Sequence, residues 1–342
     1  MSDMNPEQNP APQSETFQPP PPPSPPAAEQ PAPRPLHLRK PAIALFVVGL
    51  LILVGGIAKF IPGGIGTGGL VCFWGVLLFA FSFIPLPKTG PDAPAPMSAV
   101  QRLLGIFYEP SQVFRNLRSH PRWLAGLLLI ASLTIIYSVA FTQRLTPEVI
   151  VNYTADKMAQ TPFIPPEAVE RQREEGLEQA KNPVQRVGTA IKTVVGVFIF
   201  MSFLGALYML GVLVFGGRIN FWQSLAILIY ASVPIVVIQK VISLILLYIK
   251  APEDVHPIMG QESLVQDNLG ILFTPAEHPV LFVTASAIGL LSFYGLWLKA
   301  TGLRYGGQKV SKGAAWGTAV LFWLLGLIFF VIITALFPSF IS

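Results

Sequence analysis

Residues 225–249 read LAILIYASVPIVVIQKVISLILLYI, and this stretch decides the class of protein. Sixteen of its residues are Leu, Ile or Val, and Lys240 is the only charged one. A segment of about 20 apolar residues crosses the roughly 30 Å hydrocarbon core of a bilayer. One central lysine costs about 2.5–3.5 kcal/mol on insertion, whereas each Leu, Ile or Val contributes about −0.3 to −0.6 kcal/mol. The apolar residues therefore outweigh the lysine, and we expect a transmembrane helix.

Six more stretches of this kind predict further spans, and the composition agrees with them. Of 342 residues, 52% are hydrophobic and 12% charged, against about 25% charged in soluble domains. The mean hydropathy is +0.57. These values exclude a soluble globular enzyme, a coiled coil and a disordered chain. We predict an all-α, multi-pass transmembrane helical bundle of about seven spans, the other six being 42–61, 66–86, 123–142, 189–216, 280–299 and 315–337.

Residues 1–41 form a separate region with 14 of the 33 prolines of the chain. Such a segment cannot bury an apolar core and favours extended polyproline II. We expect a disordered, solvated cytoplasmic tail, and the alternative is a docking ligand for a domain with an aromatic groove. The first two spans, within 42–86, then form an N-terminal helical hairpin ahead of a membrane domain at 98–342.

The basic residues predict the orientation of the chain in the membrane. The loop 87–122 has five Lys or Arg residues and 299–313 has four, whereas 250–279 has Lys250 alone against five acids. Basic loops stay in the cytoplasm, so we expect a cytoplasmic N-terminus and a C-terminus outside. The loop 143–188, predicted to be outside, has six basic residues and departs from this pattern.

Two of the loops carry helical patterns of their own. In 98–119, the apolar residues Val100, Leu103, Leu104 and Phe107 are spaced like one helix face, and Pro110 starts a second helix. We interpret this segment as an amphipathic pair of helices on the inner leaflet, with arginines contacting anionic lipid. These candidate membrane-surface residues are Arg102, Arg115 and Arg118. In 143–188, prolines at 147 and 166, each followed by Glu, predict two short helices outside the membrane.

Lys240 is the one basic residue well inside an apolar run, and Gln239 and Ser243 are its polar neighbours. If the helix begins near Asn220, Lys240 reaches the outer interface and extends its ammonium group to water. We favour this interpretation. The alternative is an intramembrane polar site formed by Gln239, Lys240 and Ser243 on an ion pathway.

The residues predict no catalytic, cofactor-binding or metal site. The glycines at 64, 66 and 69 match the spacing of a dinucleotide-binding loop, but they lie between two membrane helices, where glycine permits a tight reversal. His256 and His278 share a loop with acids but lack compact metal-ligand spacing, so we expect solvated side chains. Serines in the spans have no intramembrane His or carboxylate to activate them. We therefore predict no enzyme activity.

From about residue 98 to the C-terminus the chain resembles the bacterial branch of the Yip family of Ypt-interacting membrane proteins. The resemblance rests on a series of short segments in order, with five of the predicted spans. These segments are LLGIFYEPS at 103–111, HPRW at 120–123, QRLTPE at 143–148, GRINF at 217–221 and GQKVSKG at 307–313. The hairpin 42–86 and the proline-rich tail are additions in front of this domain.

The resemblance implies a non-enzymatic helical protein of the bacterial cytoplasmic (inner) membrane. Eukaryotic members organise secretory membranes, associate with Rab GTPases and carry an acidic-Leu-Tyr-Gly-Pro element in their cytoplasmic segment, which this sequence lacks. We therefore do not expect this chain to bind Rab GTPases. We expect an adaptor or membrane organiser whose partners are the lipid bilayer and other membrane proteins or further copies of itself, with no nucleic acid and no small-molecule substrate. The alternative is a transporter or channel component with Lys240 on its pathway.

Overall fold

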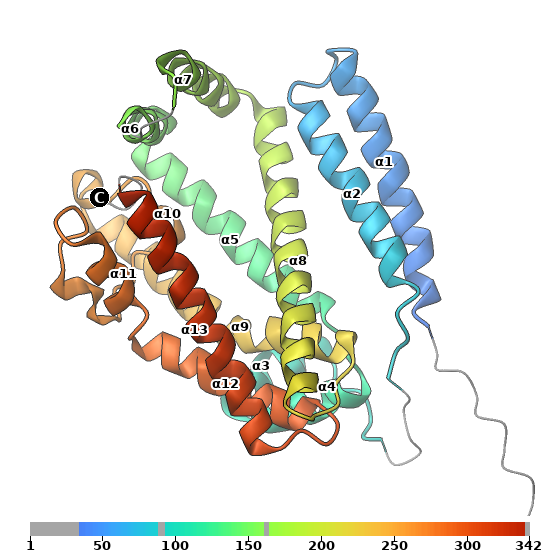
Figure 1. Cartoon of the computed structure of the whole chain (residues 1–342). Helices are drawn as coiled ribbons and strands as arrows, with labels where there is room; N and C mark the ends of the chain where they lie inside the picture. The colour runs from blue at the N-terminus through green and yellow to red at the C-terminus, as the bar shows by residue number, and fades with distance from the viewer. Residues whose placement is uncertain (1–33, 88–92, 161–163, 339–342) are drawn as a thin grey trace, which may run out of the picture. The chain divides into compact units, whose positions relative to one another are not determined.

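The computed structural model describes residues 34–87, 93–160 and 164–338, and the regular elements of these residues are helices (Figure 1). The predicted tail falls mostly outside the described residues, but η1 (Leu36–Leu38) and the start of α1 lie within its last residues. The α-helices are α1 (Arg39–Ile57), α2 (Gly64–Phe81), α3 (Ala99–Tyr108), α4 (Pro110–Ser119), α5 (Leu124–Leu145), α6 (Pro147–Ala159), α7 (Pro166–Lys181), α8 (Pro183–Val214), α9 (Phe221–Ile249), α10 (Met259–Glu262), α11 (Pro279–Ser286), α12 (Leu290–Gly306) and α13 (Lys312–Leu336). Two short 3-10 helices, η2 (Pro252–Asp254) and η3 (Leu269–Leu272), lie in the loop after α9.

Within the described residues, six helices are long and apolar enough to cross a membrane. They include α1, α2, α5, α8, α9 and α13, which agree with six of the seven predicted spans. The prediction of one continuous span at 280–299 is wrong, because this segment divides into α11 and α12. Each of these two helices alone is shorter than a full span.

The break between α11 and α12 has a local cause in the loop that follows α9. Asn268 and Gly289 form an isolated antiparallel bridge, and a Cβ at Gly289 would lie 2.8 Å from the Cβ of Asn268. The carboxylate of Asp267 accepts a hydrogen bond of 2.6 Å from the backbone N–H of Leu291. The loop thus satisfies backbone groups at the start of α12 that a continuous helix would pair internally.

The bundle has two ends, which we name from the contacts made there. The basal end comprises 36–39, 82–87, 93–124, 216–222 and 299–312, and the distal end comprises 58–63, 145–160, 164–188 and 249–279. At the basal end the Asn220 side chain donates to the Pro85 carbonyl over 2.8 Å. At the distal end Arg144 donates to the Lys250 carbonyl over 3.2 Å. The α11–α12 pair therefore returns the chain from the distal to the basal end, as one continuous span would.

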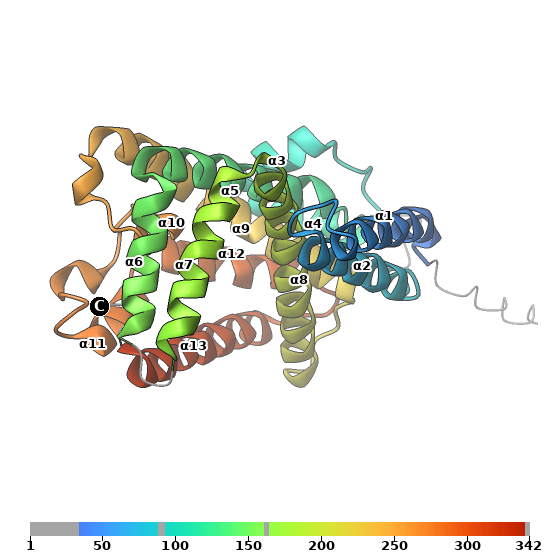
Figure 2. The same cartoon turned by 90° about the horizontal axis from the view of Figure 1, so that it is seen from above.

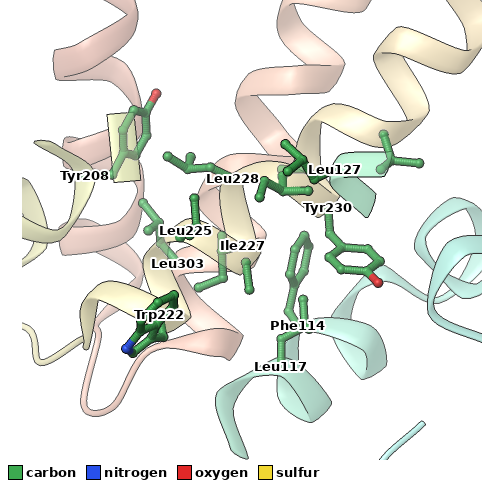
Figure 3. Packing of buried hydrophobic residues seen from close by; sticks show 14 of the residues in the cluster. Phe114, Leu117, Leu127, Tyr208, Trp222, Leu225, Ile227, Leu228, Tyr230 and Leu303 are labelled. Atoms are coloured by element: carbon green, nitrogen blue, oxygen red, sulfur yellow. The ribbon is translucent and has the colours of Figure 1, made fainter. Parts of the chain in front are cut away.

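Helix α9 forms the centre of the core and packs against α3, α4, α5, α8 and α12. Figure 3 shows its buried side chains packed together with residues from α4, α5, α8 and α12. The close approach of α12 to α9 and α4 depends on a small residue, because a Cβ at Gly302 of α12 would lie 2.5 Å from Ile227 of α9 and 3.0 Å from Phe114 of α4. Pro234 lies inside α9, where proline removes one backbone hydrogen bond of the helix.

Helices α1 and α2 pack through facing glycines. A Cβ at Gly68 would lie 2.4 Å from the backbone nitrogen of Leu53, and one at Gly56 would lie 2.4 Å from that of Ile65. The turn between the helices ends at Gly63, whose φ of +70° favours glycine. The hairpin also joins the rest of the bundle, because α2 contacts α8 and the Phe81 ring lies 4.9 Å from that of Phe221.

The two short helices predicted in 143–188 are α6 and α7, which lie side by side across the distal end (Figure 2). Both begin with proline in the first helical turn, as the sequence predicts. An ion pair of 2.8 Å joins Arg173 of α7 to Asp156 of α6.

Candidate functional site at the basal end

The predicted amphipathic pair at 98–119 is α3 and α4. Ser98 begins α3 with a capping box, in which its hydroxyl accepts from the Gln101 N–H and the Gln101 side chain accepts from the Ser98 N–H. Pro110 starts α4, as predicted. Asn116 of α4 donates to the Ala95 carbonyl over 2.8 Å, which fixes the chain segment before α3.

The two helices use their apolar residues differently. Val113, Phe114 and Leu117 of α4 are fully buried against α9 and α12 (Figure 3). On α3, by contrast, Ile106 is buried while a stripe of apolar side chains faces outward. The members of this α3 stripe are Val100, Leu104, Phe107 and Tyr108, which are 40–69% exposed. An outward apolar stripe of this kind is typical of a helix that contacts a membrane surface or a partner.

The three arginines predicted to contact lipid head groups do not form one surface. Arg115 and Arg118 of α4 are exposed, and the Arg115 guanidinium lies over the Tyr305 ring at 4.9 Å. Arg102 is buried, with 3% exposure, so the prediction of surface contact is corrected for this residue. Its Nε donates to the Tyr230 hydroxyl over 3.1 Å and its Nη1 donates to the Met97 carbonyl. The hydrogen bond to the Tyr230 hydroxyl holds the Arg102 side chain inside the protein.

Two of the short segments that carry the family resemblance pair with each other at the basal end. Arg218, in the segment 217–221, and Gln308, in 307–313, form an antiparallel bridge with backbone bonds of 2.9 and 2.6 Å. Asn220, two residues after Arg218, caps α9: its side-chain oxygen accepts a hydrogen bond from the Trp222 N–H over 2.9 Å. Gln223 in turn donates to the Arg118 carbonyl over 2.7 Å. These segments therefore join α4, α9, α12 and the chain after α2.

The other predicted polar group, Gln239, Lys240 and Ser243, lies in the distal half of α9. Because α9 begins at Phe221, Lys240 does reach toward the outer end, but it is buried there by the loop rather than extended into water. Its ammonium donates to the Glu262 carbonyl and lies 4.5 Å from the centre of the Tyr137 ring. Ser243 accepts from the Leu264 N–H over 2.9 Å. Gln239 is half-buried and makes none of these bonds.

His256 of the distal loop is also bound to its surroundings, contrary to the expectation of a solvated side chain. Its Nδ1 accepts from the N–H groups of Ile258 and Met259, over 3.2 and 3.1 Å. The remaining nitrogen, Nε2, therefore carries the proton in the neutral ring and donates to the Tyr153 hydroxyl over 3.1 Å. Burial lowers the pKa of His256, and the nearby positive charge of Lys157 lowers it further.

The described residues contain no group of three or more His, Cys, Asp or Glu side chains that could hold a metal ion. The basal end has an exposed surface formed by the apolar α3 stripe and by Arg115 and Arg118 of α4. Together with the six membrane-length helices, this arrangement defines an integral multi-pass helical membrane protein.

The family model of the Yip1 domain matches residues 104–333, which is 230 of the 342 residues. The chain therefore belongs to the Yip1 domain family, as its short segments indicate. The match begins within α3 and ends within α13, so it includes the basal end from α4 onward and leaves out the α1–α2 hairpin. A comparison with curated proteins gives no match. A comparison with solved structures gives none either.

Proposed function

We propose that this protein is a non-enzymatic membrane organiser or adaptor, and that it acts through its basal end. The outward stripe of α3 carries the proposal. Val100, Leu104 and Tyr108 are more than half exposed, although the opposite face of their helix packs against α4 and α9 and its start is capped. Apolar side chains in such a position are stabilised by burial, by about 25 cal/mol per Å² of surface removed from water.

The adjacent charges favour the membrane surface as the place of burial. Arg115 and Arg118 lie on the exposed face of α4, where anionic lipid head groups would attract each of them by about 1 kcal/mol. Basic residues near spans favour the cytoplasmic side, so we place the N-terminus and the basal end at the cytoplasmic face of a bacterial inner membrane. There the stripe and the arginines form a surface on which lipids and other membrane proteins, or further copies of this chain, can assemble.

A depth measurement on the full-length protein tests this placement. Cys72 is the only cysteine, so a Cys72→Ser background permits single labels with an environment-sensitive fluorophore. A label at Leu104→Cys should report an apolar environment and should be quenched by lipids that carry a nitroxide near the head group. The matched control is Glu175→Cys on the exposed face of α7 at the distal end, which should report water. Equal quenching at both positions, or none at Leu104, would refute lipid contact by the stripe.

We assign Lys240 a structural role instead of a place on a transport pathway. Its ammonium donates a hydrogen bond to the Glu262 carbonyl and lies over the Tyr137 ring. Together these contacts hold the distal loop against α5 and α9. A pathway residue needs access to both a pore and a moving ion. An ion-flux assay in vesicles with Lys240→Leu would reverse this assignment if the wild type carried a flux that the variant lacked.

A further inference from the structure

The basal end contains a half-open cavity of about 940 Å³ between the N-terminal hairpin and the start of α5. Its walls come from η1, α1, α2, α3, the α4–α5 connection, α5 and α9. The polar lining includes His37, Arg102, His120 and Arg122, and no Asp or Glu of the described residues lines it. The electrostatic character of the cavity is therefore positive, and it favours an anion.

Arg102 lines this cavity as a buried cation, and none of the described residues supplies an anionic partner for it. Its hydrogen bonds go to a tyrosine hydroxyl and a carbonyl, both of them neutral. In the described part of the chain the side-chain ion pairs are both made by Arg173 at the distal end. A buried charge is costly unless an opposite charge compensates it, so the site favours a bound anionic group.

The other walls are apolar and one of them faces the bilayer. Leu124 and Leu128 of α5 line the cavity while about half of each side chain is exposed, on a helix long enough to cross the membrane. Trp74 of α2 also lines it, and the indole Nε1 of this residue is buried without a hydrogen-bond partner. A ligand with acceptor oxygens would satisfy this donor.

We propose that the cavity binds one anionic glycerophospholipid, with its phosphate at Arg102 and Arg122 and its acyl chains along Leu124 and Leu128 toward the bilayer. A positive end next to an apolar wall matches an amphiphile better than a soluble anion. Because none of the described lining residues is Asp or Glu, no carboxylate among them pairs with the ammonium of a zwitterionic head group, so an anionic one is preferred. This site is separate from the α3 stripe, and it would join the hairpin to the Yip1 domain whether or not the stripe contacts lipid.

Native mass spectrometry of the full-length protein in detergent tests the proposal by titration with phosphatidylglycerol or phosphatidylcholine. The wild type should retain one phosphatidylglycerol with higher affinity than phosphatidylcholine. Arg102→Gln should weaken this binding about tenfold, the loss expected for one hydrogen bond to a charged group. Because Arg102 also anchors α3, Arg122→Gln serves as a second variant, since this side chain is exposed and its loss should leave the fold intact.

Arg304→Gln is the matched control, because Arg304 is an exposed arginine of the basal end that does not line the cavity. Its affinity for phosphatidylglycerol should equal that of the wild type. Glycerol phosphate at millimolar concentration should fail to displace the lipid, and displacement would show that the site takes a free phosphate and would overturn the proposal. Equal affinity for the two lipids, or unchanged binding in both cavity variants, would overturn it as well.

Discussion

Replacement of Gly68 by alanine tests the packing that holds the N-terminal hairpin together. The added Cβ would lie 2.4 Å from the nitrogen of Leu53 and 2.7 Å from both the Leu53 Cα and the Gly49 carbonyl oxygen. All three atoms belong to the backbone of α1, so no side-chain rotation can relieve the contact. Carbon contacts are most favourable at about 3.5–4.0 Å, and α1 must therefore move by about 1 Å.

Two opposite effects then decide the stability of Gly68→Ala. Alanine in place of glycine favours the helix by about 1 kcal/mol, whereas forced separation of packed elements costs about 1–3 kcal/mol. A displacement of this size also forfeits a quarter to a half of each dispersion contact across the interface. We expect net destabilisation of the α1–α2 contact by about 1–2 kcal/mol.

The neighbouring Gly69→Ala is the matched control, because the nearest atom to its Cβ would be a Leu53 methyl carbon at an ordinary 3.8 Å. Cys72, the only cysteine, lies on α2 with its thiol 3.6 Å from the Phe46 carbonyl of α1, so its reaction with a thiol probe reports separation of the two helices. The reaction should be faster in Gly68→Ala than in the wild type and unchanged or slower in Gly69→Ala. Equal rates in both variants would refute the close-packing argument.

Three further predictions concern the distal loop and the start of α9. The lowered pKa of His256 means that the unfolded loop binds a proton more readily, so its stabilisation is complete above the ordinary pKa of about 6.5 and declines as the pH falls below that value. After correction for the intrinsic pH dependence of amide exchange, the protection of the loop should decrease between pH 7.5 and 5.5 in wild type and in a His278→Gln control, but much less in His256→Gln. Lys240→Met should accelerate exchange at 259–264 by about tenfold, through loss of a bond from a charged donor, while Lys250→Met leaves it unchanged. Asn220→Ala should destabilise the protein by about 1 kcal/mol in detergent melting experiments, because α9 loses its cap; unchanged melting would contradict the role assigned to the cap.

The sequence predicts those parts of the fold that depend on local patterns. Apolar length alone locates six of the spans, and the position of proline at 110, 147 and 166 locates the starts of α4, α6 and α7. The order of short segments predicts the family. Each of these features depends on residues that are near one another in the chain.

The features that the sequence analysis missed depend on contacts between distant segments. Nothing in the apolar run at 280–299 indicates that Asp267 binds the start of α12 and interrupts the span. The pattern of Val100, Leu103 and Leu104 suggests an apolar face but not whether it faces the core or the surroundings. Arg102 resembles its exposed neighbours in sequence and is buried because Tyr230, 128 residues further along, accepts its hydrogen bond.

The sequence also contains a signal for tight packing of the α1–α2 hairpin, in addition to the glycines that permit its reversal. Gly64 and Gly68 have the four-residue spacing that lets membrane helices approach closely, and Gly49 and Gly56 repeat every seven residues on α1. The structure pairs these two sets. Glycines at helical spacing in both halves of a hairpin therefore predict tight packing as well as a turn.

The most direct test of the proposed adaptor role is photo-crosslinking in native membranes from the basal end. A photoreactive residue replaces Gln112 on the exposed face of α4, and the control position is Glu175 on α7 at the distal end. We expect a reproducible adduct with another membrane protein or a second copy of this chain from position 112 and none from position 175. The adduct should disappear when Leu104→Glu is introduced into the α3 stripe. No protein adduct from position 112, or the same adducts from both positions, would contradict the proposed adaptor role.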